Sequence, residues 1–274
     1  MHFRQGKPCQ DYALSGTFEN ISFAIVSDGC GSGENTDIGA RFAALAAAAA
    51  IKNHWSINRS FINKNDPKEI SLKQSIIQGD TYHMLGLSRE DMLATCLLVY
   101  ISPEGGFIHV LGDGVIAWKS KNGAIVMRRL DWLRNAPLYP IYGEDNFSSF
   151  IAFHGGDKET LALSVEEWRY EPTKGHEHIK KSEISIANAI NGHTEFFSKE
   201  RILEEEIEFI AIFSDGAAQI ENMDWKNTIV ELLAYKSMAG AFVKRRAISF
   251  LKSGKKPLDD LSVAAIRLSR EEEE

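Results

Sequence analysis

The sequence has few of the features that mark secreted or membrane-spanning proteins. Among its 274 residues are only three cysteines, an odd number without the spacing of a disulfide framework, which fits a reducing compartment. Its longest apolar stretch, residues 40–51, is interrupted by Arg41 and is mostly alanine, so we expect no bilayer-spanning segment. The first residues lack the charged-then-apolar pattern of a signal peptide. We therefore expect a cytoplasmic protein with no membrane partner.

Positive charge is also scarce, which argues against a nucleic-acid partner. The formal net charge is −7, of which the run Glu271-Glu272-Glu273-Glu274 contributes four. A short basic cluster, Lys244-Arg245-Arg246, is interpreted as the solvated face of a helix. The 44% hydrophobic content and the absence of a linker-like stretch are typical of a globular protein. We expect a monomer with a single domain over residues 1–268 and an acidic disordered tail over residues 269–274.

What the sequence does have is a repeated pattern in which an apolar run ends in a small residue followed by Asp-Gly. Asp28, Asp113 and Asp215 each follow such a run, and in a reversed copy the pair Asp259-Asp260 precedes an apolar run. Carboxylates gathered at buried strand ends need a counter-charge such as a divalent metal ion. Because Asp-Gly is also common turn chemistry, the residues alone leave two interpretations open, an acidic metal site and ordinary turns.

Hydrophobic periodicity and turn residues predict a chain rich in strands, with helices near both ends. Strands are expected at residues 12–14, 21–27, 93–101, 106–111, 115–119, 124–128, 147–154, 160–168, 184–189, 207–213 and 261–268. Helices are expected at residues 38–54, from Asp66-Pro67 onward, at 225–235 and at 239–252, with Thr36 as the N-cap of the first. Residues 93–128 predict a β-meander whose middle turn carries Asp113.

In this order, the acidic motifs resemble those of the metal-dependent type 2C (PPM) protein serine/threonine phosphatases, particularly their divergent bacterial branch. The resemblance covers residues 6–268. It rests on Gln10-Asp11 for the family's Glu-Asp pair, Ser27-Asp28-Gly29-Cys30-Gly31 for its Asp-Gly-His-Gly-Gly signature, Ala94-Thr95-Cys96 for its Gly-Ser/Thr-Thr-Ala segment, Gly112-Asp113-Gly114 for Gly-Asp-Ser, Ser214-Asp215-Gly216 and Asp259-Asp260-Leu261-Ser262-Val263. Six motifs in the correct order carry more weight than any one of them.

The resemblance implies a fold and a metal centre. The fold is α+β, a four-layer α-β-β-α sandwich of two antiparallel sheets flanked by helices. Two Mg²⁺ or Mn²⁺ ions are implied, with a possible third. The implied ligands are Asp28 as the bridge, the Gly29 carbonyl on one ion, Asp215 and Asp259 on the other, and Asp113 with Asp215 on a third. Asp11 and Thr95 would stand behind these ligands, Asp11 orienting metal-bound water.

The implied activity is hydrolysis of phosphoserine or phosphothreonine in proteins, with Asp28, Asp215 and Asp259 as catalytic residues. Two divalent ions lower the pKa of a bridging water and stabilise the phosphoryl oxygens during in-line displacement. The partner would be a phosphorylated protein, for example the product of a bacterial Ser/Thr kinase. No nucleophilic Cys-Arg or Ser-His arrangement is then required.

The sequence departs from the family pattern at two positions. Cys30 stands where many members have a His proposed to protonate the leaving alkoxide, so metal-bound water is an alternative donor. Gly6 stands where a phosphate-gripping Arg is expected, which leaves Lys7 or Arg4 as substitutes in substrate binding. These departures keep open a second hypothesis, a catalytically weak regulatory or binding module of the same fold. A third hypothesis, an acidic two-metal nuclease, is disfavoured by the absence of a basic groove.

Several other residues are interpreted as structural rather than functional. The cysteines Cys9, Cys30 and Cys96 each adjoin a motif, and a small apolar role is favoured over a redox switch. His176 and His178 are interpreted as surface residues of a polar loop. Asp260 is expected to cap or hydrogen-bond locally rather than to bind metal. The tryptophans are assigned to packing.

Overall fold

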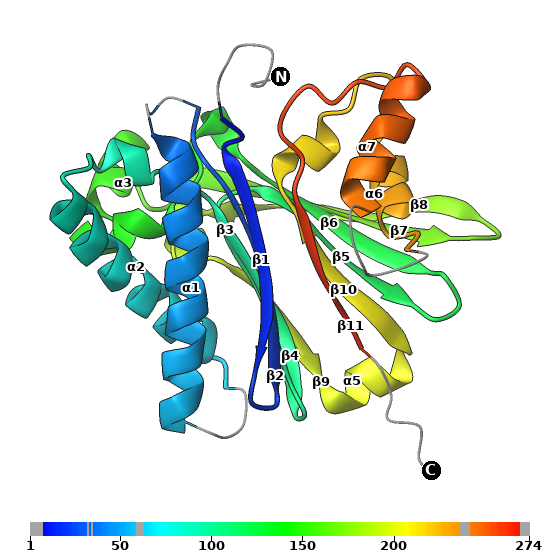
Figure 1. Ribbon diagram of the computed structural model, residues 1–274, viewed down its shortest axis with the longest axis horizontal. Helices are drawn as coiled ribbons and strands as arrows, with labels where there is room; N and C mark the ends of the chain where they lie inside the picture. The colour runs from blue at the N-terminus through cyan, green and yellow to red at the C-terminus, as the bar shows by residue number, and fades with distance from the viewer. Residues whose placement is uncertain (1–7, 32, 34, 59–62, 236–241, 269–274) are drawn as a thin grey trace.

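The polypeptide forms two stacked antiparallel sheets with helices on both outer faces (Figure 1), in the computed structural model that describes residues 8–31, 33, 35–58, 63–235 and 242–268. The first sheet has five strands in the order β1-β2-β3-β4-β9 and the second has six in the order β11-β10-β5-β6-β7-β8. The expected α-β-β-α sandwich is therefore confirmed. No helix of the described residues is long and apolar enough to cross a bilayer.

The strands of both sheets are bounded as follows. The first sheet contains β1 (Asp11–Phe18), β2 (Ile21–Asp28), β3 (Cys96–Ser102), β4 (Gly105–Leu111) and β9 (His193–Ser198). The second contains β5 (Gly114–Ser120), β6 (Ile125–Trp132), β7 (Leu161–Glu171), β8 (Gly175–Ser185), β10 (Ile207–Phe213) and β11 (Val263–Arg267).

The helices are distributed on the two outer faces and in the connections. They are α1 (Thr36–Asn58), α2 (Asp66–Leu85), α3 (Ser148–Phe153), α4 (Ile186–Ala189), α5 (Lys199–Glu204), α6 (Trp225–Leu232) and α7 (Phe242–Lys252). The 3₁₀ segments among the described residues are η2 (Glu90–Met92), η3 (Leu133–Asn135), η4 (Pro140–Asp145) and η5 (Asp215–Ala218).

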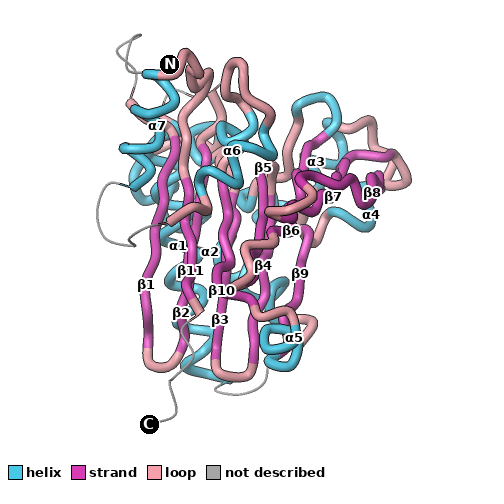
Figure 2. Tube along the Cα trace, turned by 90° about the vertical axis from the view of Figure 1, so that its right-hand side faces the viewer, coloured by secondary structure: helices cyan, strands magenta, loops and turns pink. Residues whose placement is uncertain are grey.

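Three apolar layers hold the sandwich together. On the outer face of the first sheet, the alanine-rich side of α1 packs against β2 and β3, because small side chains let the helix approach closely. On the outer face of the second sheet, α6 and α7 pack against β5 and β10. The largest layer lies between the sheets, where alternate residues of β2, β3, β5 and β10 interdigitate. Figure 2 shows β10 and β11 lying over β2 and β3 in this arrangement.

The predicted meander is wrong at its centre, because the chain changes sheets there. β4 pairs with β3 and β9 in the first sheet, whereas β5 pairs with β6 and β10 in the second. The crossing is made by Gly112 and Gly114, whose φ angles of 111° and 138° lie in the left-handed region. A Cβ at Gly112 would meet Thr95 Cβ at 2.6 Å, and one at Gly114 would meet the Phe213 carbonyl oxygen at 2.6 Å. Asp113 is thus held between the two sheets rather than in a hairpin turn.

Other differences from the expected elements lie mostly in the second half of the chain. Residues 147–154 were expected to be a strand, but this segment contains helix α3. Residues 184–189 were also expected to be a strand, but they contain the end of β8 and helix α4. The strands β8 and β9 were not expected. His176 and His178 lie on β8 rather than in a loop.

At the start of α1, Thr36 does not act as the expected N-cap. It lies in the first turn, fully buried, and its hydroxyl accepts a hydrogen bond from the Gln10 side-chain amide at 2.7 Å. The expected acidic tail, residues 269–274, lies outside the described residues. Within the described residues, the first strand, β1, begins at Asp11.

Candidate active site

The carboxylates of the sequence motifs meet at one end of the sandwich. They line a pocket of about 180 Å³ between the two sheets. Its walls are Gln10, Asp28, Gly29, Cys30, Gly31, Thr95, Asp113, Asn135, Pro137, Tyr139, Asp215 and Asp259. Asp11 lies directly behind them, since the register of β1 and β2 pairs it with Asp28. Every motif of the acidic set therefore reaches the same place.

Backbone hydrogen bonds on both sides fix the position of Asp28 at the end of β2. Its N–H donates to the Thr95 hydroxyl at 3.0 Å, and its carbonyl accepts from the Thr95 N–H at 2.8 Å. The next residue, Gly29, donates to the Gln10 carbonyl at 3.0 Å. A Cβ at Gly29 would meet the Thr36 carbonyl oxygen at 2.4 Å, so the close approach of helix α1 requires glycine here. Thr95 thus orients the backbone of the carboxylate it was expected to support.

Asp215 occupies the equivalent position at the end of β10, in the second sheet. Gln219 donates from Nε2 to its Oδ2 at 2.6 Å, and its Oδ1 is buried without a hydrogen-bond partner among the described residues. A Cβ at the following Gly216 would meet the Asp260 carbonyl oxygen at 1.7 Å, so the loop before β11 passes directly over this turn. Asp259 is carried into the pocket by that loop.

Two serines connect Asp11 to the second sheet. Ser214 donates from its hydroxyl to Asp11 Oδ2 at 2.7 Å and accepts from the Ser262 N–H at 3.0 Å. Ser214 belongs to the Ser-Asp-Gly motif and Ser262 to the Asp-Asp-Leu-Ser motif, so these motifs also have a structural role. Asp11 is therefore held at the seam where the two sheets meet.

Asp260 does not behave as expected, because its hydrogen bond is long-range. Its Oδ2 accepts from the Gln10 N–H at 2.8 Å, which ties the loop before β11 to the beginning of β1. Its own N–H donates to Asp259 Oδ1 at 2.9 Å. The carboxylate was expected to cap or hydrogen-bond locally, and instead it joins two chain segments that are far apart in sequence.

Burial and mutual repulsion raise the pKa values of the aspartates in this cluster. Burial raises the pKa of Asp11 to about 6. Burial, then repulsion from Asp11 and Asp215, raises the pKa of Asp28 well above its ordinary value. Burial and the charge of Asp215 raise the pKa of Asp113 to about 7, and the pKa of Asp215 is raised by burial and by the charge of Asp259. Without a cation, several of these groups hold a proton near neutral pH.

The donor set fits a hard divalent cation. Asp28 lies close enough to Asp11 and Asp215 for their charges to raise its pKa, and a bound cation would relieve this repulsion. The unpartnered Oδ1 of Asp215 is a further oxygen available to such an ion. No three His, Cys, Asp or Glu side chains in the described ranges form a ready-made ligand cluster as they stand.

One wall of the pocket was not foreseen from the sequence. Asn135, Pro137 and Tyr139 come from the irregular connection between β6 and α3 and cover the carboxylates from one side. Burial and a hydrogen bond with Cys30 raise the pKa of the Tyr139 hydroxyl. Cys30 also packs among apolar residues of α2, η2 and η4, including Met92 and Ile141. The only sequence signal in this region is the Asn-Ala-Pro turn, which predicts a loop but does not indicate that the loop lines a functional site.

The remaining candidate residues lie outside the described residues or outside the pocket lining. Arg4 and Lys7, the expected substitutes for a phosphate-binding arginine, lie outside the described residues. Neither Arg nor Lys occurs among the pocket-lining residues given above. Burial raises the pKa of the Cys9 thiol to about 11 and that of Cys96 to about 12, which makes both poor nucleophiles at neutral pH.

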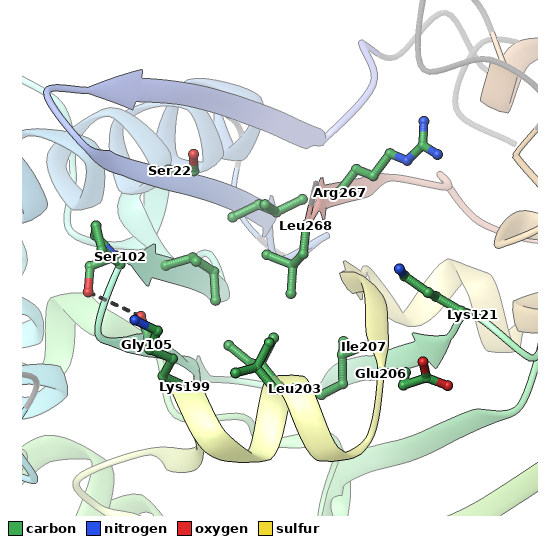
Figure 3. Close-up of a pocket in the computed structure, with 14 residues that line it drawn as sticks. Ser22, Ser102, Gly105, Lys121, Lys199, Leu203, Glu206, Ile207, Arg267 and Leu268 are labelled. Atoms are coloured by element: carbon green, nitrogen blue, oxygen red, sulfur yellow. Dashed lines mark hydrogen bonds between the residues drawn. The ribbon is translucent and has the colours of Figure 1, made fainter. Parts of the chain in front are cut away.

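A larger hollow of about 360 Å³ lies at the opposite end of the sandwich (Figure 3). Its centre is aliphatic, with Ile207, Leu203 and Leu268, and Lys121 and Lys199 lie on its wall. Glu206 is the one carboxylate among the described residues that line it. This hollow has no cluster of acids, so its size does not make it the candidate active site.

Comparison with known proteins identifies the class of protein that the fold and the acidic pocket define. A family model described as protein phosphatase 2C matches residues 1–135, which include β1 to β6 and the motifs around Asp11, Asp28, Thr95 and Asp113. The first half of the chain thus matches the protein phosphatase 2C family. No curated protein matches the sequence.

Solved structures extend the likeness of fold to nearly the whole chain. The serine/threonine phosphatase Stp1 from Staphylococcus aureus is 13% identical, with a TM-score of 0.53 over 96% of this chain and 91% of that one. A bacterial serine phosphatase bearing an arginine-to-lysine substitution is 14% identical, with a TM-score of 0.50 over 97% of this chain and 94% of that one. At these identities the likeness concerns the fold.

Proposed function

We propose that the protein is a metal-dependent phosphatase that hydrolyses phosphoserine or phosphothreonine in proteins. The observation that carries this proposal is the buried acidic pocket, in which Asp28, Asp113 and Asp215 have raised pKa values and one carboxylate oxygen of Asp215 has no partner among the described residues. Such a group of acids is costly to bury without a cation, and it belongs to a chain with the protein phosphatase 2C fold.

In this proposal, Asp28, the Gly29 carbonyl, Asp215 and Asp259 hold two Mg²⁺ or Mn²⁺ ions, and Asp113 with Asp215 holds a third. When bound, the ions would supply an activated water and positive charge for the phosphoryl oxygens. Asp11, anchored by the Ser214 hydroxyl, can accept a proton at Oδ1 or hold it during the reaction. These residue roles follow the family resemblance and the position of each side chain in the pocket.

The wall opposite the carboxylates would position the substrate. Tyr139 is protonated at neutral pH, as tyrosines ordinarily are, and burial raises its pKa further, so its hydroxyl can donate to a phosphoryl oxygen. Asn135 can donate from its amide on the same side of the pocket. The volume of about 180 Å³ accommodates a phosphoryl group and a short side chain, and the peptide would lie outside.

The test is release of phosphate from phosphoserine and phosphothreonine peptides in the presence of Mn²⁺. The wild-type protein and Asp80→Asn, a change on the exposed side of α2, should be active, whereas Asp215→Asn should not. Release by all three proteins would place the activity elsewhere, and release by none of them, beside an active control phosphatase, would refute the proposal.

A second candidate, a binding module with little catalysis, is favoured by two observations. The described lining of the pocket contains no Arg or Lys to grip a phosphate, and Cys30 occupies the position of a proposed acid. This candidate predicts Mn²⁺ binding and phosphoprotein binding with negligible turnover. Calorimetry with Mn²⁺ beside the phosphatase assay distinguishes the two candidates. A phosphatase binds Mn²⁺ and releases phosphate, whereas a binding module binds Mn²⁺ with negligible phosphate release.

A further inference from the structure

A separate, more enclosed cavity lies behind the wall of the acidic pocket. It has a volume of about 160 Å³ and is formed by one face of α2, by η4 and the turn after it, and by the end of β4. Its apolar lining includes Leu72, Leu111, Pro140, Phe147 and Ile190. A cavity of about 150 Å³ is large enough to hold a benzene ring. The space is therefore suited to one aromatic ring or a branched aliphatic chain.

Polar groups without partners face this apolar space. Ser71 and Ser75, one turn apart on α2, line the cavity, and both hydroxyls are buried with no hydrogen-bond partner among the described residues. Ser75 is only 2% exposed. Buried hydroxyls are normally satisfied, and leaving one unpaired is unfavourable. The two serines are thus donors that a bound molecule could satisfy.

The other polar residues of the lining are also donors. Lys68 stands one turn before Ser71, and Asn146 and Asn191 contribute carboxamides. Lys68 makes no ion pair with any described residue, and no acidic side chain among them lines the cavity. A donor-rich rim around an apolar interior is complementary to a molecule with an anionic, acceptor-rich head and an apolar body.

We propose that this cavity binds a small carboxylate whose apolar body is about the size of one ring. The carboxylate would lie toward Lys68 and Ser71, and the ring would occupy the space between Leu111 and Phe147. A free phosphate ion fits less well, because it offers no apolar surface to the greater part of the lining. This site is independent of the proposed phosphatase activity.

The cavity shares two walls with the acidic pocket. Leu111 is followed by Gly112 and Asp113, and Pro140 is preceded by Tyr139, so each wall carries a residue of the acidic pocket on its other side. On the cavity side, Asn146 and Phe147 have φ angles of 54° and 63°, a conformation that costs non-glycine residues energy. A molecule bound here would contact the segments that position Asp113 and Tyr139.

The probe for this site is 3-phenylpropionate, titrated into the full-length protein and followed by amide NMR spectra. We expect saturable binding with a dissociation constant of about 1 mM or below, with shifts at Leu111, Gly112 and Phe147. The neutral amide of the probe and inorganic phosphate should each bind at least about tenfold more weakly. Absence of saturation by 3-phenylpropionate would overturn the proposal, as would equal affinity for phosphate.

Matched variants locate the binding. Ser71→Leu fills the cavity and should abolish saturation, whereas Lys73→Leu, on the same helix and outside the cavity, should leave the affinity unchanged. Ser75→Ala should weaken binding by about fivefold and raise the thermal midpoint, because it removes an unpaired buried hydroxyl. If Ser71→Leu fails to fold, Lys68→Gln provides the same test from the rim, with Lys73→Gln as its control. Unchanged affinity in the cavity variants would overturn the assignment.

Discussion

The two ends of the sandwich each carry a hollow, and they differ in size and in chemistry. The larger hollow has an aliphatic centre with lysines on its wall, and a single carboxylate among its described lining residues. The smaller one crowds acids together behind a tyrosine wall, where burial and mutual repulsion raise their pKa values. Unfavourable charge burial, rather than volume, therefore distinguishes the candidate active site.

The largest expected effect comes from removing the central acid of the smaller hollow. Asp28→Ala should lower Mn²⁺-dependent phosphate release by about 10³-fold or more, because the proposed site loses its bridging ligand. Glu206→Gln, the matched change in the larger hollow, should leave the rate unchanged. Circular dichroism checks that both variants fold. Comparable losses in the two variants would remove the distinction between the two ends.

The acidic end also depends on close backbone approach, which a glycine pair can test. Gly216→Ala should destabilise the protein by at least about 2 kcal/mol, because the new Cβ would overlap the Asp260 carbonyl oxygen. At Gly31, the nearest atom to a new Cβ is Gln10 Oε1 at 3.9 Å, so Gly31→Ala should change stability by no more than about 0.5 kcal/mol. Urea unfolding measures both, and equal effects would contradict the close approach of the two loops at Gly216.

The raised pKa values predict how the metal-free protein responds to pH. An acid whose pKa is raised in the folded state stabilises the fold below its unfolded pKa, and this stability is lost as pH rises through the folded pKa. With Asp11 at about 6 and Asp113 at about 7, stability should fall between about pH 4 and pH 7. Increases of about two and about three pH units in these pKa values, at about 1.4 kcal/mol per unit, give an expected loss on the order of 5 kcal/mol, measured by urea unfolding with EDTA.

Two additions sharpen the pH measurement. Mn²⁺ should restore stability above neutral pH, because a bound cation compensates the ionised carboxylates. Asp113→Asn should reduce the dependence on pH, since it removes one group that titrates in this range. A metal-free stability that rises from about pH 5 to about pH 8 would show that the acids are not crowded as described.

The smallest effect is expected in the larger hollow. Leu203 is 45% exposed, so Leu203→Ala should cost about 1 kcal/mol or less in unfolding free energy and leave Mn²⁺-dependent activity unchanged. Thermal unfolding and the phosphatase assay measure the two quantities. A large loss of activity would mean that the two ends are coupled.

The central strands and the acidic positions could be predicted from the sequence because both follow from local patterns. Continuous apolar runs such as residues 21–27 and 207–213 became β2 and β10, and the aspartate after each run reached the pocket. Which sheet each strand joins depends on pairing with segments far away in the sequence, so local patterns do not predict it. For this reason the change of sheet at Asp113, and the long-range bond of Asp260 to Gln10, could not be foreseen.

The wrong and missed elements have physical causes. The aromatic residues around Phe150 are typical of a strand. Instead, this segment forms a short helix in which Phe150 packs against Trp132. The helix follows Asn146 and Phe147, which have left-handed backbone conformations. β8 is an edge strand with mostly exposed polar side chains, so its sequence has no apolar alternation to detect. Tyr139 was missed because a loop residue acquires its role only when the loop folds over the acids.

The most direct test of the central claim is a crystal structure of the protein grown with Mn²⁺, with anomalous scattering used to locate the ions. The proposed site predicts anomalous peaks at the acidic end, contacted by Asp28 and Asp215. The same crystals should show no peak in the larger hollow at the opposite end. Ordered carboxylates without any peak between them, at a Mn²⁺ concentration that supports phosphate release, would contradict the account.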